Sequence, residues 1–165
     1  TRIVRARRDV LIVEHRLGFV MANAGVDQSN VAEADEGEFA LLLPCDPDGS
    51  AERLRRDIAA RTGVAPGVVI SDSFGRPWRR GTVGVAIGAA GLPSLVDRRG
   101  QTDLFGRTLK ATMIAVADHI AAAATLLMGE AAEGQPVAIL RGLSFDAPPS
   151  AAAALLRPIE EDLFR

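Results

Sequence analysis

The sequence predicts an α+β fold in which mixed β-sheets pack with one long, buried, alanine-rich helix. Short apolar runs bounded by turn residues, such as residues 10–13 and 68–70, are typical of strands. A longer run of alanine and other apolar residues at 108–128 predicts the helix. The 165 residues, of which 48% are hydrophobic, suffice for one domain with a buried core.

The amino-terminal part of the chain predicts strands and turns. Residues 10–13 and 18–22 are two apolar runs separated by a short polar turn, so we expect a β-hairpin. Asn23, Ala24 and Gly25 then break the pattern, because Asn and Gly tolerate positive φ. Residues 26–30 should follow as an exposed loop or a first helical turn. Residues 39–43 predict another strand, which Pro44 stops.

The rest of the chain alternates helices and strands. Ser50 is a suitable N-cap, and it predicts a helix over residues 51–61. The helix at 108–128, ended by Gly129, is apolar on nearly all sides, so we expect it to be buried within the domain or against a partner chain. The other expected elements are strands at 68–70, 83–87 and 136–140, a charged link at 97–100 and a short helix at 151–156.

Composition argues against several classes of protein. A net charge of -2 and a pI near 5.7 disfavour a general nucleic-acid binder. The most apolar run, residues 113–128, contains Asp118 and His119 and is shorter than the roughly 20 residues that span a bilayer, so no membrane span is expected. Cys45 is the single cysteine and cannot form an internal disulfide, so we expect a reducing compartment, the cytosol.

Asp72 and Ser73 give the strongest local signal for a functional site. They end an apolar strand, which places a carboxylate and a hydroxyl at the rim of a sheet, and both are hard ligands suited to magnesium or manganese. Their alternative role is to cap the following turn. Arg76, Arg79 and Arg80 follow closely, and such cations beside a metal-type carboxylate are what phosphate chemistry needs. Each arginine taken singly is more often a solvated surface side chain.

Two further segments carry oxygen ligands. Asp27 and Asn30 lie three residues apart and would share a face of a helix, although a turn or N-cap role is the alternative. Glu130 follows the carboxyl end of the long predicted helix, where the helix dipole favours a bound cation, although the glycine- and alanine-rich segment also fits a simple loop. The two histidines, His15 and His119, are expected to be structural. No phosphate loop with Gly-Lys-Ser/Thr and no dinucleotide-binding glycine pattern is present in the sequence.

Three ordered motifs, at residues 23–30, 71–79 and 127–136, together closely resemble the coenzyme F420-0 gamma-glutamyl ligase family. The linking segments 86–93 and 103–106 and the tail 160–165 look like the same family, so the resemblance covers essentially the whole chain. It implies a GTP-dependent enzyme that adds L-glutamate to coenzyme F420-0 and extends a gamma-linked polyglutamate tail through an acyl phosphate. It also implies an intertwined homodimer and dependence on manganese or magnesium at two sites, with a monovalent cation as a further candidate.

The resemblance carries roles to individual residues by motif, and it assigns no catalytic residue. Asp27 and Asp72 would bind one metal, and Ser73 and Glu130 a second. Arg76 and Arg79 are candidates to bind the substrate's phosphodiester or developing charge. The residues that would contact GTP are Asn30, Met128, Gly129, Glu130, Ala131, Ala132, Glu133, Gly134 and Gln135.

Members of this family usually carry a further amino-terminal segment that supplies part of the nucleotide pocket, so the chain is expected to correspond to the carboxy-terminal two thirds of the family. Two other classes of function stay open. The chain could be a non-catalytic module that binds a nucleotide or a deazaflavin, or a metal-dependent phosphohydrolase that uses the same acidic residues.

Overall fold

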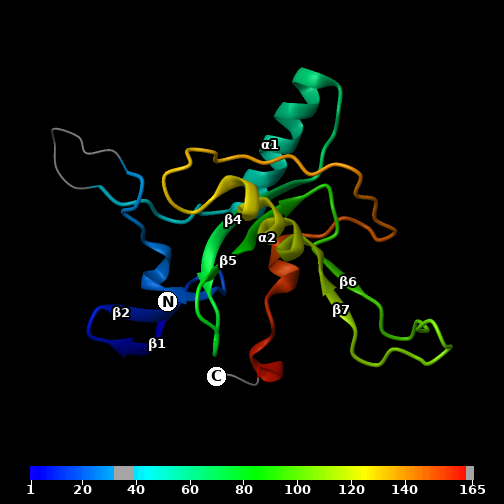
Figure 1. Cartoon of the computed structure of the whole chain (residues 1–165), viewed down its shortest axis with the longest axis horizontal. Helices are drawn as coiled ribbons and strands as arrows, with labels where there is room; N and C mark the ends of the chain where they lie inside the picture. Colours follow the sequence, from blue (N-terminus) through cyan, green and yellow to red (C-terminus); the bar gives the residue numbers. More distant parts are fainter. Residues whose placement is uncertain (32–38, 163–165) are drawn as a thin grey trace.

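The computed structural model describes residues 1–31 and 39–162, which form three small antiparallel sheets and two α-helices (Figure 1). The strands are β1 (Arg2–Arg7), β2 (Val10–Glu14), β3 (Val20–Ala22), β4 (Val68–Gly75), β5 (Thr82–Ala90), β6 (Leu95–Asp97) and β7 (Met113–Ala115). The helices are α1 (Pro47–Thr62) and α2 (Val116–Met128), with 3-10 turns η1 (Asn23–Gly25), η2 (Ala152–Leu155) and η3 (Ile159–Glu161).

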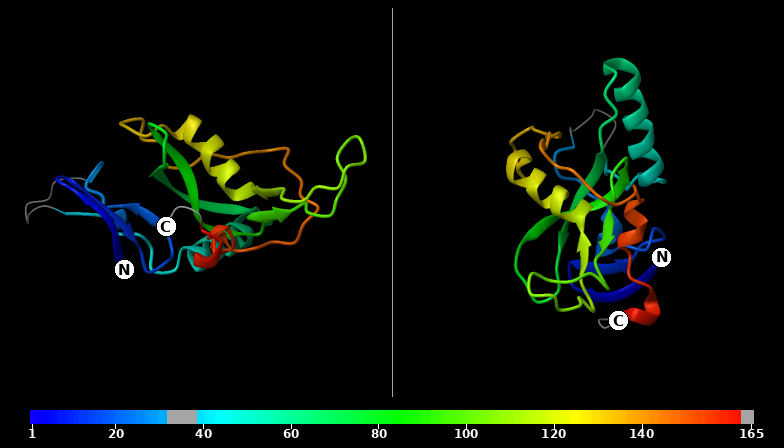
Figure 2. Two further views of the ribbon diagram at one scale, coloured as in Figure 1. Left: turned by 90° about the horizontal axis from the view of Figure 1, so that it is seen from below. Right: turned by 90° about the vertical axis from the view of Figure 1, so that its right-hand side faces the viewer.

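The β4–β5 hairpin is the centre of the fold. Its antiparallel ladder pairs Ser73 with Gly84 and Gly75 with Thr82, and its register shifts between Ile70 and Ser71. The helices α1 and α2 lie on opposite sides of this hairpin, whereas the loop that joins β6 to β7 projects away from it (Figure 2). The hairpin therefore fixes where the ends of both helices lie.

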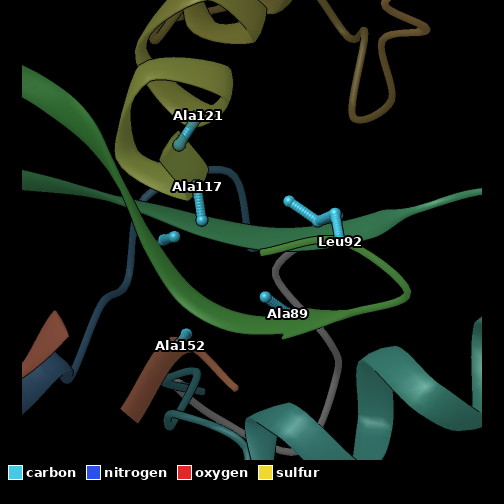
Figure 3. Packing of buried hydrophobic residues seen from close by; sticks show 6 residues of the cluster. Ala89, Leu92, Ala117, Ala121 and Ala152 are labelled. Carbon is cyan, nitrogen blue, oxygen red and sulfur yellow. The ribbon is translucent and has the colours of Figure 1, made fainter. Parts of the chain in front are cut away.

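Small side chains allow α2 to lie very close to β5. The buried cluster between them consists of alanines with one leucine, and Ala117 and Ala121 point from α2 toward the strand (Figure 3). A Cβ atom added to Gly84 would lie 2.7 Å from the carbonyl oxygen of Ala121, so only glycine fits at this crossing. The close approach brings the carboxyl end of α2 to the turn end of the hairpin, where β5 begins at Thr82.

Two carboxylates attach the helices to β5 by accepting backbone hydrogen bonds. From α1, Asp48 Oδ1 accepts from the N–H of Ala89 at 2.8 Å and of Ala152 at 2.7 Å. From α2, Asp118 Oδ1 accepts from the N–H of Ala86 at 2.9 Å, although burial raises the pKa of this carboxyl group. These bonds provide acceptors for two N–H groups of β5 and one of η2.

A second apolar cluster joins the β1–β2–β3 sheet to the hairpin. Phe19, Met21 and Ile87 are buried in it. The rings of Phe19 and Phe74 meet edge to face, with centroids 5.9 Å apart and an interplanar angle of 81°. The contact brings the segment that follows β3 to β4, and this segment carries the first predicted metal ligand.

Several sequence predictions are confirmed. The α+β class holds, and residues 10–13 lie in β2, which pairs with β3 as the expected hairpin. Residues 68–70 and 83–87 lie in β4 and β5, and the short helix expected at 151–156 is the 3-10 turn η2. The predicted mixed sheets are wrong for the described residues, because all the strand pairs found there are antiparallel.

Other predictions need correction. The helix expected at 51–61 begins at Pro47, since proline is favourable in a first helical turn, and Asp46 caps it by accepting from the N–H of Gly49 at 2.9 Å. Ser50 is therefore not the N-cap. Residues 39–43 form only an isolated bridge, between Asp27 and Leu41. No ladder includes residues 136–140 in the part of the chain that the structure describes.

The long helix is shorter and less buried than predicted. It begins at Val116, because residues 113–115 form β7 and pair with β6. Its inner side is buried at Ala117 and Ala121, whereas Leu126 on its outer side is 87% exposed. Burial within the domain thus accounts for one side of the helix only. The strand β1 was not predicted, because its arginine-rich sequence has no apolar face. The last three residues of the motif 160–165 lie outside the described residues.

Candidate functional site

The predicted site residues of β4 lie near the turn end of the β4–β5 hairpin, just before β4 ends at Gly75. Successive side chains of a strand point to opposite faces, so Asp72 and Ser73 face opposite sides of β4. The carboxylate of Asp72 is half-buried, and its Oδ1 accepts from the N–H of Ser73 at 2.7 Å. The strand end thus presents one ligand group to each side.

Asp27 reaches this strand from the segment that follows β3. Asn23 and Ala24 adopt positive φ in η1 and turn the chain there. Asp27 then forms a local turn, in which its carboxylate accepts from the N–H of Ser29 at 2.8 Å and from the Ser29 hydroxyl at 2.7 Å. These hydrogen bonds to Ser29 lower the pKa of Asp27, so its carboxylate stays ionised.

The carboxylates of Asp27 and Asp72 repel each other. Burial raises the pKa of Asp72, and the negative charge of Asp27 raises it further. A divalent cation between two such carboxylates would relieve both effects, because it replaces lost hydration and cancels the repulsion. The two side chains therefore fit a site for a hard cation.

Glu130 lies on the other side of β4, just beyond α2. Gly129 ends the helix with a φ of 74°, and the side chain of the next residue then turns toward the hairpin. Oε1 of Glu130 accepts a hydrogen bond from the Ser73 hydroxyl at 2.9 Å, and its Oε2 accepts one from the hydroxyl of Thr82. Residues that are 57 and 48 positions apart in the sequence thus meet at one carboxylate.

Asn30 and Glu133 hold the loop that follows Glu130. Asn30, which has a positive φ of 53°, donates from Nδ2 to the carbonyl oxygen of Ala131 at 3.0 Å. The carboxylate of Glu133 accepts from the N–H of Ala131 at 2.8 Å, and this hydrogen bond lowers the pKa of Glu133. The backbone of Ala131 is therefore fixed on both sides.

A pocket of about 570 Å³ lies between these segments. It is lined by Ser29, Asn30, Ser73 and residues 128–136, so every residue predicted to contact the nucleotide borders it. A volume of this size falls in the range of small-molecule sites, which is roughly 300–1,000 Å³. A separate cavity of about 120 Å³ at Leu17, Cys45 and Ile87 contains none of the predicted site residues.

The predicted metal ligands fall into two pairs rather than one cluster. Asp27 and Asp72 interact on one side of β4, and Ser73 and Glu130 interact on the other. Within residues 1–31 and 39–162, no group of three or more His, Cys, Asp and Glu side chains is arranged to hold a metal ion. The donors present are all oxygens, which suit magnesium or manganese.

The two predicted substrate arginines lie in the turn between β4 and β5. Arg76 is partly buried, and its Nη1 atom is buried without a hydrogen-bond partner among the described residues. Arg79 is exposed. A buried guanidinium N–H that lacks a partner is unfavourable, so an anionic group at this position would stabilise Arg76.

Thr82 was missed in the sequence, and the histidines have no role in the site. The only signal for Thr82 was its place at the start of the strand that returns beside Ser73, which becomes informative once the register is known. His15 accepts at Nδ1 from the N–H of Leu17 at 3.3 Å, and His119 is exposed on α2. No helix in the described part of the chain is long and apolar enough to cross a membrane.

Comparison with known proteins gives a consistent result. A family model described as F420-0:Gamma-glutamyl ligase matches residues 1–142. The chain is similar to proteins named coenzyme F420:L-glutamate ligase from Methanocaldococcus jannaschii, at 48% identity over 99% of this chain, and from Methanothermobacter thermautotrophicus, at 50% over 100%. A protein of the same name from Methanopyrus kandleri is 49% identical over 99% of the chain. The matches cover 64%, 65% and 65% of these relatives, so the chain spans just under two thirds of their length.

Proposed function

Because this chain belongs to the F420-0:gamma-glutamyl ligase family, we propose that it forms the metal- and nucleotide-binding part of an enzyme that joins L-glutamate to coenzyme F420-0. The reaction consumes GTP, forms an amide bond and extends a gamma-linked tail.

One observation carries the proposal. Segments around residues 30, 73 and 130 come together at one pocket, through the hydrogen bond from Ser73 to Glu130 at 2.9 Å and the bond from Asn30 to Ala131 at 3.0 Å. Both bonds link parts of the chain that are distant in sequence, so the pocket is a product of the fold and not of one loop. A ligase of this type needs such a place to hold a triphosphate beside its acceptor.

The proposed metal ligands are the two pairs on either side of β4. Asp27 with Asp72 would hold one divalent cation, and Ser73 with Glu130 the other, since all four supply hard oxygen donors. When bound, manganese or magnesium would neutralise the triphosphate oxygens and polarise the phosphoryl group that is transferred. Asn30 supports the loop from 128 to 135 against the nucleotide by its hydrogen bond to Ala131.

Arg76 is the proposed contact for the anionic part of the deazaflavin substrate. Its buried Nη1 lacks a partner in the described residues, and the turn that carries it directly follows Asp72 and Ser73. A guanidinium group binds phosphate oxygens in a planar, two-point manner, which orients as well as attracts. Arg79, exposed in the same turn, would add positive charge at the mouth of the site.

A homodimer is part of the proposal. Leu126 is 87% exposed on the outer side of α2, and Val137 and Ile139, in the nearby carboxy-terminal segment, are 76% and 73% exposed. Apolar surface of this kind usually marks an interface, and a second copy of the chain would cover it. Sedimentation equilibrium of the wild type and of Leu126→Glu tests this, because the substitution should shift a dimer toward the monomer.

The test of the activity uses the protein that carries this chain, incubated with GTP, L-glutamate, Mn²⁺ and coenzyme F420-0. Mass spectrometry should detect products heavier by one glutamate residue or more. Asp72→Asn should abolish the product, whereas Asp57→Asn, which alters an exposed carboxylate on α1, should not. Release of phosphate without added glutamate would instead favour a phosphohydrolase, and GTP binding that needs no metal would favour a non-catalytic module.

A further inference from the structure

We propose that Thr82 is a positioning residue for Glu130: together with Ser73 it holds the two carboxylate oxygens and so fixes the direction in which Glu130 faces the pocket. Thr82 opens β5, and its hydroxyl donates to Oε2 of Glu130, while the hydroxyl of Ser73 donates to Oε1 at 2.9 Å. The inference rests on the proposed function, in which Glu130 is a metal ligand.

The register of the hairpin places both hydroxyls on one face. Ser73 pairs with Gly84 and Thr82 pairs with Gly75, so Ser73 and Thr82 are diagonal neighbours on the same side of the sheet. It is the side that α2 covers, because a Cβ atom on Gly84 would meet Ala121 of that helix. The carboxylate that leaves the end of α2 therefore meets a donor from each strand.

Glu130 needs this support because little else orients it. It is exposed, and it follows the helix C-cap Gly129, so the backbone hydrogen bonds of α2 do not fix its side chain. The loop is next fixed at Ala131, through Asn30 and Glu133. A glutamate side chain has several rotatable bonds, and hydrogen bonds to both of its oxygens remove most of that freedom.

The two hydroxyls differ in their relation to the pocket. Ser73 lines the pocket and Thr82 does not. A carboxylate has about four lone-pair sites, so the two hydroxyl bonds leave acceptor capacity for a cation. Ser73 is thus placed to share the ligand with Glu130, whereas Thr82 supports the carboxylate from outside the pocket. Partners of this kind change metal affinity by about 10- to 100-fold when they are removed.

The test compares Thr82→Val, which removes the hydroxyl and keeps the branched shape, with Thr82→Ser, which keeps the hydroxyl. Thr108→Val is the matched control, because Thr108 is exposed in the distant loop between β6 and β7. Mn²⁺ binding is measured by the electron paramagnetic resonance signal of free Mn²⁺. Hydrogen exchange of residues 129–134 is measured without metal.

Thr82→Val should bind Mn²⁺ about 10- to 100-fold more weakly and exchange its loop amides faster. Thr82→Ser and Thr108→Val should both behave as the wild type in these assays. One result would overturn the role of Thr82 and leave the proposed function intact. In it, Thr82→Val binds Mn²⁺ and exchanges its loop amides as the wild type does, while Glu130→Gln loses Mn²⁺ binding. Unchanged Mn²⁺ binding in Glu130→Gln would overturn the metal assignment and this inference with it.

Discussion

Replacing Gly84 with alanine should separate α2 from the β4–β5 hairpin. An added Cβ atom would lie 2.7 Å from the carbonyl oxygen and 3.0 Å from the carbonyl carbon of Ala121. Backbone atoms cannot rotate away, so the helix must move. Overpacking of this kind costs about 1–3 kcal/mol. At about 2–4 °C for each kcal/mol in a domain of this size, the unfolding midpoint should fall by roughly 2–12 °C.

Gly75→Ala is the matched control, because Gly75 lies on the neighbouring strand of the same hairpin and a Cβ atom there would have nothing within 4 Å. Thermal unfolding followed by circular dichroism should give the control a midpoint equal to or above that of the wild type. Since displaced α2 would carry Glu130 with it, Gly84→Ala should also weaken Mn²⁺ binding. An unfolding midpoint of Gly84→Ala equal to that of the Gly75→Ala control would refute the close packing of α2 against β5.

Three further predictions concern aspartates. Asp72→Asn should lower turnover by orders of magnitude and leave the far-ultraviolet circular dichroism spectrum unchanged. The control Asp57→Asn should keep full turnover. Equal turnover in the two variants would show that Asp72 is not part of the site. The pKa of Asp72 is raised above its ordinary value of 3.8. The protonated carboxyl group therefore stabilises the metal-free protein at pH values below 3.8, and this stabilisation is lost as the pH rises through the raised pKa. Urea unfolding of Asp72→Asn at neutral pH should therefore give a free energy no lower than that of the wild type, and Mn²⁺ affinity of the wild type should fall as the pH drops through the same pKa. Asp48→Ala, which leaves the buried N–H of Ala89 without its acceptor, should lose about 1–3 kcal/mol in urea unfolding, and a loss no greater than that of Asp57→Ala would show that the bond is dispensable.

The sequence was informative where local chemistry decides the structure. The apolar run at 68–70 predicted a strand, and the structure has β4 there. The prediction that the strand ends at Asp72 was wrong, because β4 stays paired with β5 as far as Gly75. The turn at Asn23 was also readable, because asparagine is one of the few residues that tolerate the positive φ of 50° found there. Such features depend on neighbouring residues alone.

The errors arose where partners distant in the sequence decide the structure. Residues 113–115 have helical composition, but pairing with β6 makes them a strand. Residues 136–140 are apolar and yet belong to no ladder in the described chain. The contact between Thr82 and Glu130 depends on hairpin register and on helix packing against Gly84, neither of which a linear pattern contains.

The central claim is that the Asp27–Asp72 pair and the Ser73–Glu130 pair each bind a metal ion, and that a nucleotide binds in the pocket beside the loop from 128 to 135. A crystal grown with Mn²⁺ and a non-hydrolysable GTP analogue, measured at the manganese absorption edge, tests it directly. We predict anomalous peaks bound by Asp27 with Asp72 and by Ser73 with Glu130, with the nucleotide against the loop from 128 to 135. Manganese and nucleotide bound elsewhere, with these side chains unliganded, would contradict the claim.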